Sequence, residues 1–290
     1  MSKHTRWLLG LSVALACAGL AAAQESPIPK VLRVTREFVK PGKSSTAHEK
    51  AESAFVQAMA RAKWPTYYMA ATSLSGPERA LFLTRYATLD DWEKDMAAQD
   101  KNATLSAGLE RAYEADGELL SSVDQAVLYF QEDMSLRPVS DLSHMRFLEI
   151  AAFRVKPGHT GEWNEAVKMV KDAYEKAVPE AHWGMYREIF GGEGENYIVL
   201  TGLKSLSEED RGLTEDDARF MGAMGDDGLK RLEELLGASV ETSQHQLFAF
   251  NPAMSYVPAD WMKADDFWKP KAMAPAAKPA AKPAEKKPTP

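Results

Sequence analysis

Residues 36–55 read REFVKPGKSSTAHEKAESAF, and residues 151–170 read AAFRVKPGHTGEWNEAVKMV, two versions of the segment that decides the fold. The likeness continues from WPTYYMAATSLSGPERALFLTRYATLDDWEKD at residues 64–95 to AHWGMYREIFGGEGENYIVLTGLKSLSEED at residues 181–210. A repeat of this length predicts two copies of one folding unit rather than a solenoid of short units.

Each copy has the pattern of six consecutive elements. A strand ends at Lys-Pro-Gly, a helix with one apolar stripe follows, and two strands are joined by a Gly-containing turn. A second helical region and a last strand close the copy. The order βαββαβ predicts a ferredoxin-like α+β unit, whose sheet carries helices on one face only.

The uncovered sheet faces of the two copies predict how the copies pack. A sheet face without helices needs cover, which a second copy in the same chain can provide. We therefore expect two tandem units packed sheet to sheet, as an eight-stranded barrel ringed by helices. Six side chains are expected on the inner faces: Val31, Thr35, Val39, Phe147, Ala151 and Val155.

The N-terminal stretch reads as a secretory signal peptide rather than as part of the fold. Lys3 and Arg6 precede a short apolar run, and small residues end at Ala23, where we expect cleavage. Cys17, the only cysteine, allows a less favoured lipoprotein interpretation. Both interpretations predict a periplasmic or secreted protein, and cleavage after Ala23 would leave a chain without disulfides.

The remaining boundaries follow from the repeat and from changes in composition. We expect the signal peptide at 1–23, the first barrel half at 24–135, a linker at 136–145, the second half at 146–256, an aromatic extension at 257–268 and a disordered Pro/Ala/Lys-rich tail at 269–290. The extension is expected to pack back on the barrel or cover a cleft, with partner binding as the alternative.

The distribution of charge limits the partners. Residues 24–268 carry 27 basic and 41 acidic residues, a net charge of −14, which argues against nucleic-acid binding. The tail carries six Lys and one Glu and could contact anionic envelope polymers or serve as a solubilising spacer. No membrane span is expected after the signal peptide, and the closed barrel predicts a monomer or a homodimer.

The strand order, the repeated Lys-Pro-Gly, the aromatic strand WPTYYM or HWGMYR and the following hairpin resemble the dimeric α+β barrel superfamily, in a tandem fused form covering residues 31–251. Its members include antibiotic-biosynthesis monooxygenase-like, NIPSNAP-like and chlorite-dismutase-like proteins. The resemblance implies ligand clefts between the helices and the sheet of each half. Because activities in this superfamily are diverse, the fold alone does not define a function.

The strand after the first helix of each copy supplies the candidate site residues. His182 aligns with Thr66 and exists in one copy only, so it is the candidate proton-transfer group; drift on a surface strand is the alternative. Arg85 could hold an anionic group or pair with an acid. The other candidate ligand-binding residues are Trp183, Tyr186, Arg187, Trp64, Tyr67 and Tyr68, although repeated aromatic residues are also typical of a core.

The sequence motifs do not support a metal site, a cofactor site or a phosphate-binding loop. No histidine stands at metal-ligand spacing from another histidine or cysteine, so no metal site and no cofactor are predicted. His48 is expected as an exposed helix residue. The turn Gly191-Gly192-Glu193-Gly194 joins two strands and is expected as a hairpin rather than as a phosphate loop.

Two functions fit these observations. The favoured one is an exported, non-catalytic protein that binds a small apolar or aromatic molecule, or an envelope partner. The alternative is a cofactor-independent monooxygenase- or isomerase-like enzyme with one active cleft in the second half, where His182 transfers the proton and Trp183, Tyr186 and Arg187 shape the pocket.

Overall fold

The computed structural model describes residues 28–269. The first half contains β1 (Val31–Val39), α1 (Ser45–Ala62), β2 (Tyr68–Ser73), β3 (Arg79–Tyr86), α2 (Leu89–Lys101), α3 (Ala103–Gly117) and β4 (Leu120–Phe130). The second half contains β5 (Phe147–Val155), α4 (Thr160–Ala177), β6 (Gly184–Phe190), β7 (Glu195–Leu203), α5 (Leu206–Arg211), the π-helical turn η1 (Gly212–Asp216), α6 (Asp217–Ser239) and β8 (Val240–Phe250). The segments η2 (Pro252–Met254), α7 (Ala259–Ala264) and η3 (Asp266–Trp268) follow.

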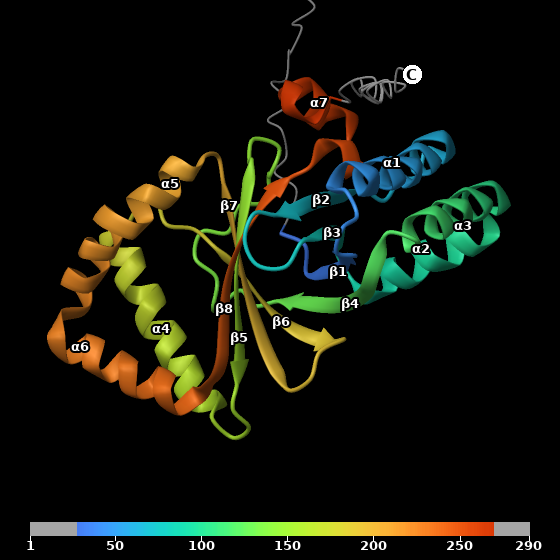
Figure 1. Ribbon diagram of the computed structural model, residues 1–290. Coiled ribbons are helices and arrows are strands. Elements are labelled where there is room, and N and C mark those ends of the chain that lie inside the picture. Colours follow the sequence, from blue (N-terminus) through green and yellow to red (C-terminus); the bar gives the residue numbers. More distant parts are fainter. Residues whose placement is uncertain (1–27, 270–290) are drawn as a thin grey trace, which may run out of the picture.

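The eight strands close into one antiparallel barrel in the order β1-β3-β2-β8-β5-β7-β6-β4. Each half contributes a four-stranded sheet, and the halves join where β2 pairs with β8 and β4 pairs with β6. Helices α1, α2 and α3 lie on one side of the barrel and α4, α5 and α6 on the other (Figure 1). The predicted pair of βαββαβ units that form a dimeric α+β barrel within one chain is confirmed.

The repeated Lys-Pro-Gly has the same structure in both copies. Gly42 has φ 83° and Gly158 has φ 85°, a left-handed conformation that glycine adopts without steric cost. The proline before each glycine supplies no backbone N–H, so the strand ladder ends at the turn. Both turns therefore reverse the chain from the first strand of a copy into its first helix.

The barrel interior holds the main apolar core. Its buried members include Leu32, Val34, Leu81, Leu83, Leu128, Leu148, Ile150, Phe248 and Phe250. Burial stabilises a protein by about 25 cal/mol for each Å² of apolar surface removed from water, so this core is the main source of the stability of the chain.

The prediction for the inner strand faces is wrong by one residue. Leu32 and Val34 point into the barrel, whereas Val31 packs with Tyr86 and Val127 on the helix side. The same inversion holds in the second half, where Leu148 and Ile150 are in the barrel core, Ala151 lines the space under the helices and Val155 packs with Trp163. Both strand faces are buried and largely apolar, so the alternation could not tell the barrel face from the helix face.

The aromatic extension packs back on the barrel, as its first interpretation predicted. Trp268 is almost completely buried and belongs to the barrel core, with Trp261 and Phe267 against it. Arg146 lies over the ring of Phe267 and pairs with Asp265 at 2.5 Å, which fastens the extension to the start of β5.

The two chain ends carry predictions that lie outside the described residues. These are the signal peptide at 1–23, the lipoprotein interpretation of Cys17 and the disordered tail, apart from Lys269. Among residues 28–269, no helix has both the length and the apolar character needed to cross a bilayer.

Candidate functional site

Each half has a cleft between its helices and the helix-facing side of its sheet. The second-half cleft has a volume of about 480 Å³, and the first-half cleft has a volume of about 340 Å³. Ligand pockets in proteins commonly fall in this size range. Both clefts lie where the superfamily resemblance implied them.

The second-half cleft has mainly apolar walls. Strands β5, β6 and β7 form its floor, and α4 with the end of α6 forms its roof. The apolar lining includes Ala151, Phe153, Met185, Val199, Trp163, Val167, Val170, Tyr174 and Leu236. A molecule in this cleft would exchange water for aliphatic and aromatic side chains over most of its surface.

A carboxyl and an imidazole stand together at one edge of this floor. Glu149 on β5 has an oxygen 3.9 Å from Nδ1 of His245 on β8. Burial, together with the negative charge of Glu209, raises the pKa of Glu149 above its usual range, while His245 acts in the opposite direction. Glu149 and His245 both line the cleft, so the pair can bind a polar substituent of a ligand or exchange a proton with it.

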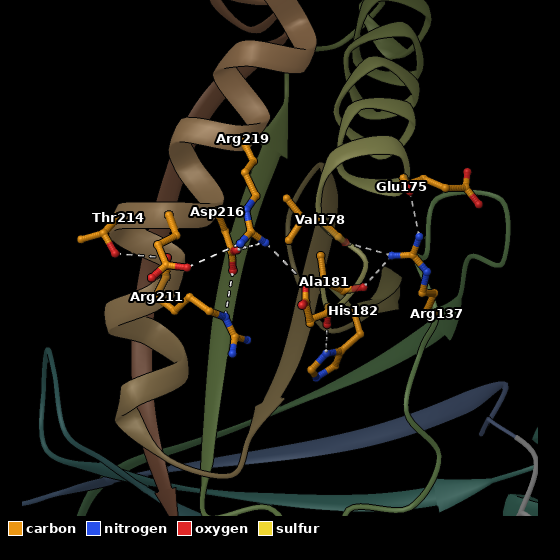
Figure 2. Close-up of polar contacts among 11 residues, drawn as sticks. Arg137, Glu175, Val178, Ala181, His182, Arg211, Thr214, Asp216 and Arg219 are labelled. Carbon is orange, nitrogen blue, oxygen red and sulfur yellow. Dashed lines mark hydrogen bonds and ion pairs between the residues drawn. The ribbon is translucent and has the colours of Figure 1, made fainter.

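A second polar group comes from the π-helical turn η1. The carboxylate of Asp216 is largely buried, 3.4 Å from Nε of Arg211 and 3.5 Å from a guanidinium nitrogen of Arg219 (Figure 2). Arg219 also reaches Glu180 in the loop before β6. Single π-helical turns recur at functional sites because they displace one side chain from the regular helix spacing. The pair with Asp216 holds Arg211, which lines the cleft.

His182 lines the same cleft, but its ring nitrogens face backbone carbonyls. Nδ1 lies 3.1 Å from the oxygen of Glu180 (Figure 2), and Nε2 lies 2.9 Å from the oxygen of Gly202 on β7. An imidazole held between two acceptors has no ring lone pair directed at a ligand. Its geometry therefore fits a residue that positions the loop between α4 and β6 better than a general base.

The other second-half candidates lie in different environments. Trp183 lines the cleft and donates its indole N–H to the oxygen of Met134. Tyr186 points into the barrel core, where its hydroxyl donates to the oxygen of Pro29, and Arg187 is exposed. Arg85, predicted as an anion holder, also faces the barrel side; it lines a small cavity with Tyr186. The structure therefore brings His182, Trp183, Tyr186 and Arg85 together at a small cavity of about 60 Å³ but separates Arg187 from them.

The first-half aromatic candidates separate as well. Trp64 is buried and donates its indole N–H to Asp95 at 3.0 Å, and Tyr68 lines the first-half cleft. Tyr67 is 39% exposed and packs against Tyr256, with ring centroids 5.0 Å apart. Trp64 and Tyr68 therefore line the first-half cleft, while Tyr67, Tyr68 and Arg85 line a separate cavity of about 550 Å³.

Sequence reasoning missed a polar cluster at the inner wall of the first-half cleft. Glu37, His48, Glu52 and Asp116 are all buried, and one potential ligand atom from each lies within 4.8 Å of the others. The prediction that His48 is exposed is wrong: only 3% of its surface is accessible. The spacing of His48 and Glu52, four residues apart on one helix face, was the available signal.

Comparisons with known proteins give similarity of fold only. No family model matches the chain, and no curated protein matches it. Among solved structures, a proposed monooxygenase from Lactobacillus acidophilus NCFM has 8% identity and a TM-score of 0.45, over 76% of this chain and 93% of that chain. An anthrone oxidase-like protein has 14% identity and a TM-score of 0.49, over 77% of this chain and 92% of that chain.

A chlorite dismutase variant from Candidatus Nitrospira defluvii has 11% identity and a TM-score of 0.44, over 83% of this chain and 96% of that chain. At such identities and TM-scores, neither the activities nor the residue roles of these proteins carry over to this chain.

Proposed function

We propose that the second-half cleft binds a small, mainly apolar molecule of the size of a two- or three-ring aromatic compound. The observation that carries the proposal is a cleft of about 480 Å³ whose walls are aliphatic and aromatic side chains from β5, β6, β7, α4 and α6. Pockets of this size and character bury most of the surface of such a ligand.

The polar groups of the cleft give the proposed ligand an orientation. Glu149 and His245 stand at one edge of the floor, and Arg211 on α5 also lines the cleft. A hydroxyl or keto substituent on an otherwise apolar ring system would suit this distribution, because a few placed polar groups fix orientation in apolar pockets.

Proton transfer to or from the bound molecule is the second candidate function, as in a cofactor-independent oxygenase or isomerase. Its support is the carboxyl of Glu149, whose pKa is raised by burial and which stands beside His245 in the cleft. A carboxyl with a raised pKa is suited to exchange protons near neutral pH. Glu149 replaces His182 as the candidate base in this version.

Comparing the strand register of the second half with that of the first half identifies a substitution that would fill the second-half cleft. Ala151 pairs with Val199 in the second half, as Thr35 pairs with Phe82 in the first. Phenylalanine is therefore already accommodated at the place in the first half that corresponds to Val199. The substitution Val199→Phe reduces the second-half cleft with little risk to the fold.

Titration with 1-aminoanthracene, whose emission rises in apolar surroundings, tests the proposal. We expect saturable binding of one molecule per chain, and at least about tenfold weaker binding by Val199→Phe, since filling a pocket removes its apolar contacts. Leu109→Phe, which fills the first-half cleft instead, is the matched control and should bind as the wild type does. Equal affinity of Val199→Phe and the wild type would contradict the proposal.

Turnover of the bound compound separates the two candidates. Binding without His245- or Glu149-dependent oxygen consumption or isomerisation supports a carrier or sensor. Turnover that is lost in Glu149→Gln while binding is retained supports the enzyme.

We further propose that the protein acts outside the cytoplasm, with residues 1–23 as its signal peptide. Mass spectrometry of the chain from a periplasmic or culture fraction should find an N-terminus at Gln24. An unprocessed chain confined to the cytoplasm would contradict this.

A further inference from the structure

The first-half cleft contains a cluster of ionisable side chains that neither the proposed ligand site nor the barrel core uses. Glu37 comes from the end of β1, His48 and Glu52 from one face of α1, and Asp116 from the last turn of α3. Nε2 of His48 lies 3.1 Å from an oxygen of Glu37 and 3.4 Å from an oxygen of Asp116.

The cluster has an excess of buried negative charge. Glu52 and Asp116 are 3% and 2% exposed, and no lysine or arginine among residues 28–269 lies within 4.0 Å of the three carboxylates. Burial and the neighbouring carboxylates raise the pKa of Glu52 well above its usual range, and burial with the charge of Glu37 raises the pKa of Asp116 to about 6. Buried carboxylates at such proximity need protons or a cation to be stable.

Two carboxylate oxygens in the cluster lack hydrogen-bond partners. Oε1 of Glu52 and Oδ1 of Asp116 are fully enclosed and receive no hydrogen bond from the part of the chain that the structure describes; the nearest cationic group to Oδ1 of Asp116 is Nε2 of His48, at 3.4 Å. Orphaned buried acceptors of this kind are rare in native proteins, and a bound ion is one of the arrangements that satisfies them. Both atoms belong to side chains that contribute to the same 4.8 Å group.

The second half supplies an internal comparison. Helices α1 and α4 both have 18 residues, and their buried positions 48, 52 and 58 correspond to 163, 167 and 173. His48 and Glu52 thus correspond to Trp163 and Val167. The strand registers match Glu37 with Phe153 and Leu120 with Val240, and Asp116 and Leu236 each lie four residues before the members of this second pair.

These four second-half residues form part of an apolar cluster, with Phe153 and Trp163 in contact at 5.2 Å between ring centroids. The fold therefore accepts a purely hydrophobic filling at this place. Packing alone does not require the four ionisable residues of the first half.

We propose that Glu37, His48, Glu52 and Asp116 bind a divalent first-row transition-metal ion at the inner wall of the first-half cleft. Imidazole nitrogen and carboxylate oxygen are ligands that Zn²⁺, Mn²⁺ and Fe²⁺ accept. Ligand atoms about 2.1 Å from such an ion lie about 3–4.2 Å apart, so the observed group needs only small side-chain shifts to close around it.

The ion faces a cavity rather than solid core. Glu37, Glu52 and Asp116 line the cleft of about 340 Å³, together with Tyr68 and Tyr113. An ion held by four protein ligands at a cavity wall can take a further ligand from the cavity side only by expanding its coordination to five or more. Tyr68, whose buried hydroxyl has no hydrogen-bond partner among the described residues, lines the same cleft and is a candidate to contact such a ligand.

Equilibrium dialysis of the chelator-treated protein against Zn²⁺ and against Mn²⁺, with metal analysis, tests the proposal. We expect one ion per chain, and at least about tenfold weaker binding by Glu52→Gln and by His48→Gln, because each removes one ligand. His159→Gln is the matched control: His159 also lies beside a glutamate, Glu162 at 3.3 Å, but on the surface of the second half, and its loss should leave binding unchanged.

Thermal unfolding with and without Zn²⁺ provides a second readout, and the unfolding transition itself shows whether each variant is folded. An ion that binds only the folded state raises the unfolding temperature. We expect that rise in the wild type and in His159→Gln and its loss in Glu52→Gln and Asp116→Asn. The absence of a bound ion in the wild type, or binding that survives both Glu52→Gln and His48→Gln, would overturn the proposal.

Discussion

Nε2 of His48 lies 3.1 Å from Oε2 of Glu37 at a buried place that the second half fills with the aromatic contact of Phe153 and Trp163. The two halves share strand order and helix placement but differ in chemistry beneath the helices. The first half holds ionisable groups there, whereas the second half holds an apolar cleft. Function in this chain is therefore expected where the copies diverge.

The cluster should be unfavourable to stability when no cation is present. Glu52→Met removes a buried carboxylate and keeps a similar volume, so we expect the metal-free variant to gain about 1–3 kcal/mol in free energy of unfolding. Urea denaturation in the presence of a chelator measures this. Glu49→Met, at the neighbouring helix position, is a control that loses the bond to Asn251 and should gain nothing. A loss of stability in Glu52→Met would mean that the carboxylate is already satisfied in the metal-free protein.

Asp95 is the centre of a separate, fully satisfied polar group in the first half. Its carboxylate accepts from the indole of Trp64 at 3.0 Å, the hydroxyl of Thr66 at 2.6 Å and the hydroxyl of Tyr86 at 2.9 Å. Removing it would leave these three donors, and the side-chain amide of Gln99 that donates to it at 3.2 Å, without their acceptor, so Asp95→Ala should cost about 3 kcal/mol or more in free energy of unfolding.

Urea denaturation checks the prediction for Asp95. The exposed Asp90→Ala, which breaks only the surface pair with Lys94, should cost less than about 1 kcal/mol. Equal losses in the two variants would show that Asp95 is not a structural centre.

Gly191 fixes the junction between the halves. It has φ 110°, and a Cβ there would lie 2.2 Å from the backbone oxygen of Gln125 on β4. Gly194 has φ 76°, but a Cβ there would meet nothing closer than 3.8 Å. Gly194→Ala should therefore cost about 1 kcal/mol from backbone strain alone, and Gly191→Ala clearly more. Thermal unfolding of both variants tests the difference, and similar melting temperatures would contradict the close approach of β6 to β4.

The ion pair of Arg146 and Asp265 predicts a pH dependence. Asp265 accepts hydrogen bonds from the guanidinium of Arg146 and from the backbone N–H of Phe267, and these bonds lower its pKa to about 2. Because the folded pKa is below the unfolded value of 3.8, the stabilisation is present above about pH 4 and is lost as pH falls towards 2. Asp265→Asn should be less stable than the wild type at pH 6, and the gap should close between pH 4 and pH 2.

Acid titration of thermal stability measures the behaviour of Asp265. Asp266→Asn is the control, since Asp266 is 85% exposed and pairs only with Lys269 among the described residues. A gap between wild type and Asp265→Asn that stays constant from pH 6 to pH 2 would contradict the predicted linkage.

The repeat was sufficient to predict the barrel, because two βαββαβ copies leave two sheet faces that must cover each other. It was insufficient to orient the strands, since Val31 and Leu32 are equally apolar and both are buried. Trp268 could be placed on the barrel from its aromatic neighbours, although its entry into the core depends on the path of the preceding chain.

The candidate sites were harder to predict for a different reason. His182 was the visible difference between the copies. Its two ring nitrogens, however, face backbone carbonyls, and no sequence motif predicts those contacts. Glu37 and Asp116 lie 79 residues apart in sequence and meet only because β1 and α3 pack on α1. The four-residue spacing of His48 and Glu52 was visible in the sequence, but the ionisable side chains on this face of α1 wrongly suggested solvent exposure.

A single crystal structure with two anomalous scatterers tests most directly whether the first half binds a metal ion and the second half binds an apolar ligand. Crystals grown with Zn²⁺ and 6-bromo-2-naphthol, measured at the zinc and bromine absorption edges, should show zinc among Glu37, His48, Glu52 and Asp116. Bromine should lie beneath α4, near Val199. Zinc outside the first-half cluster, bromine in the first-half cleft, or no peak at either place would contradict the account.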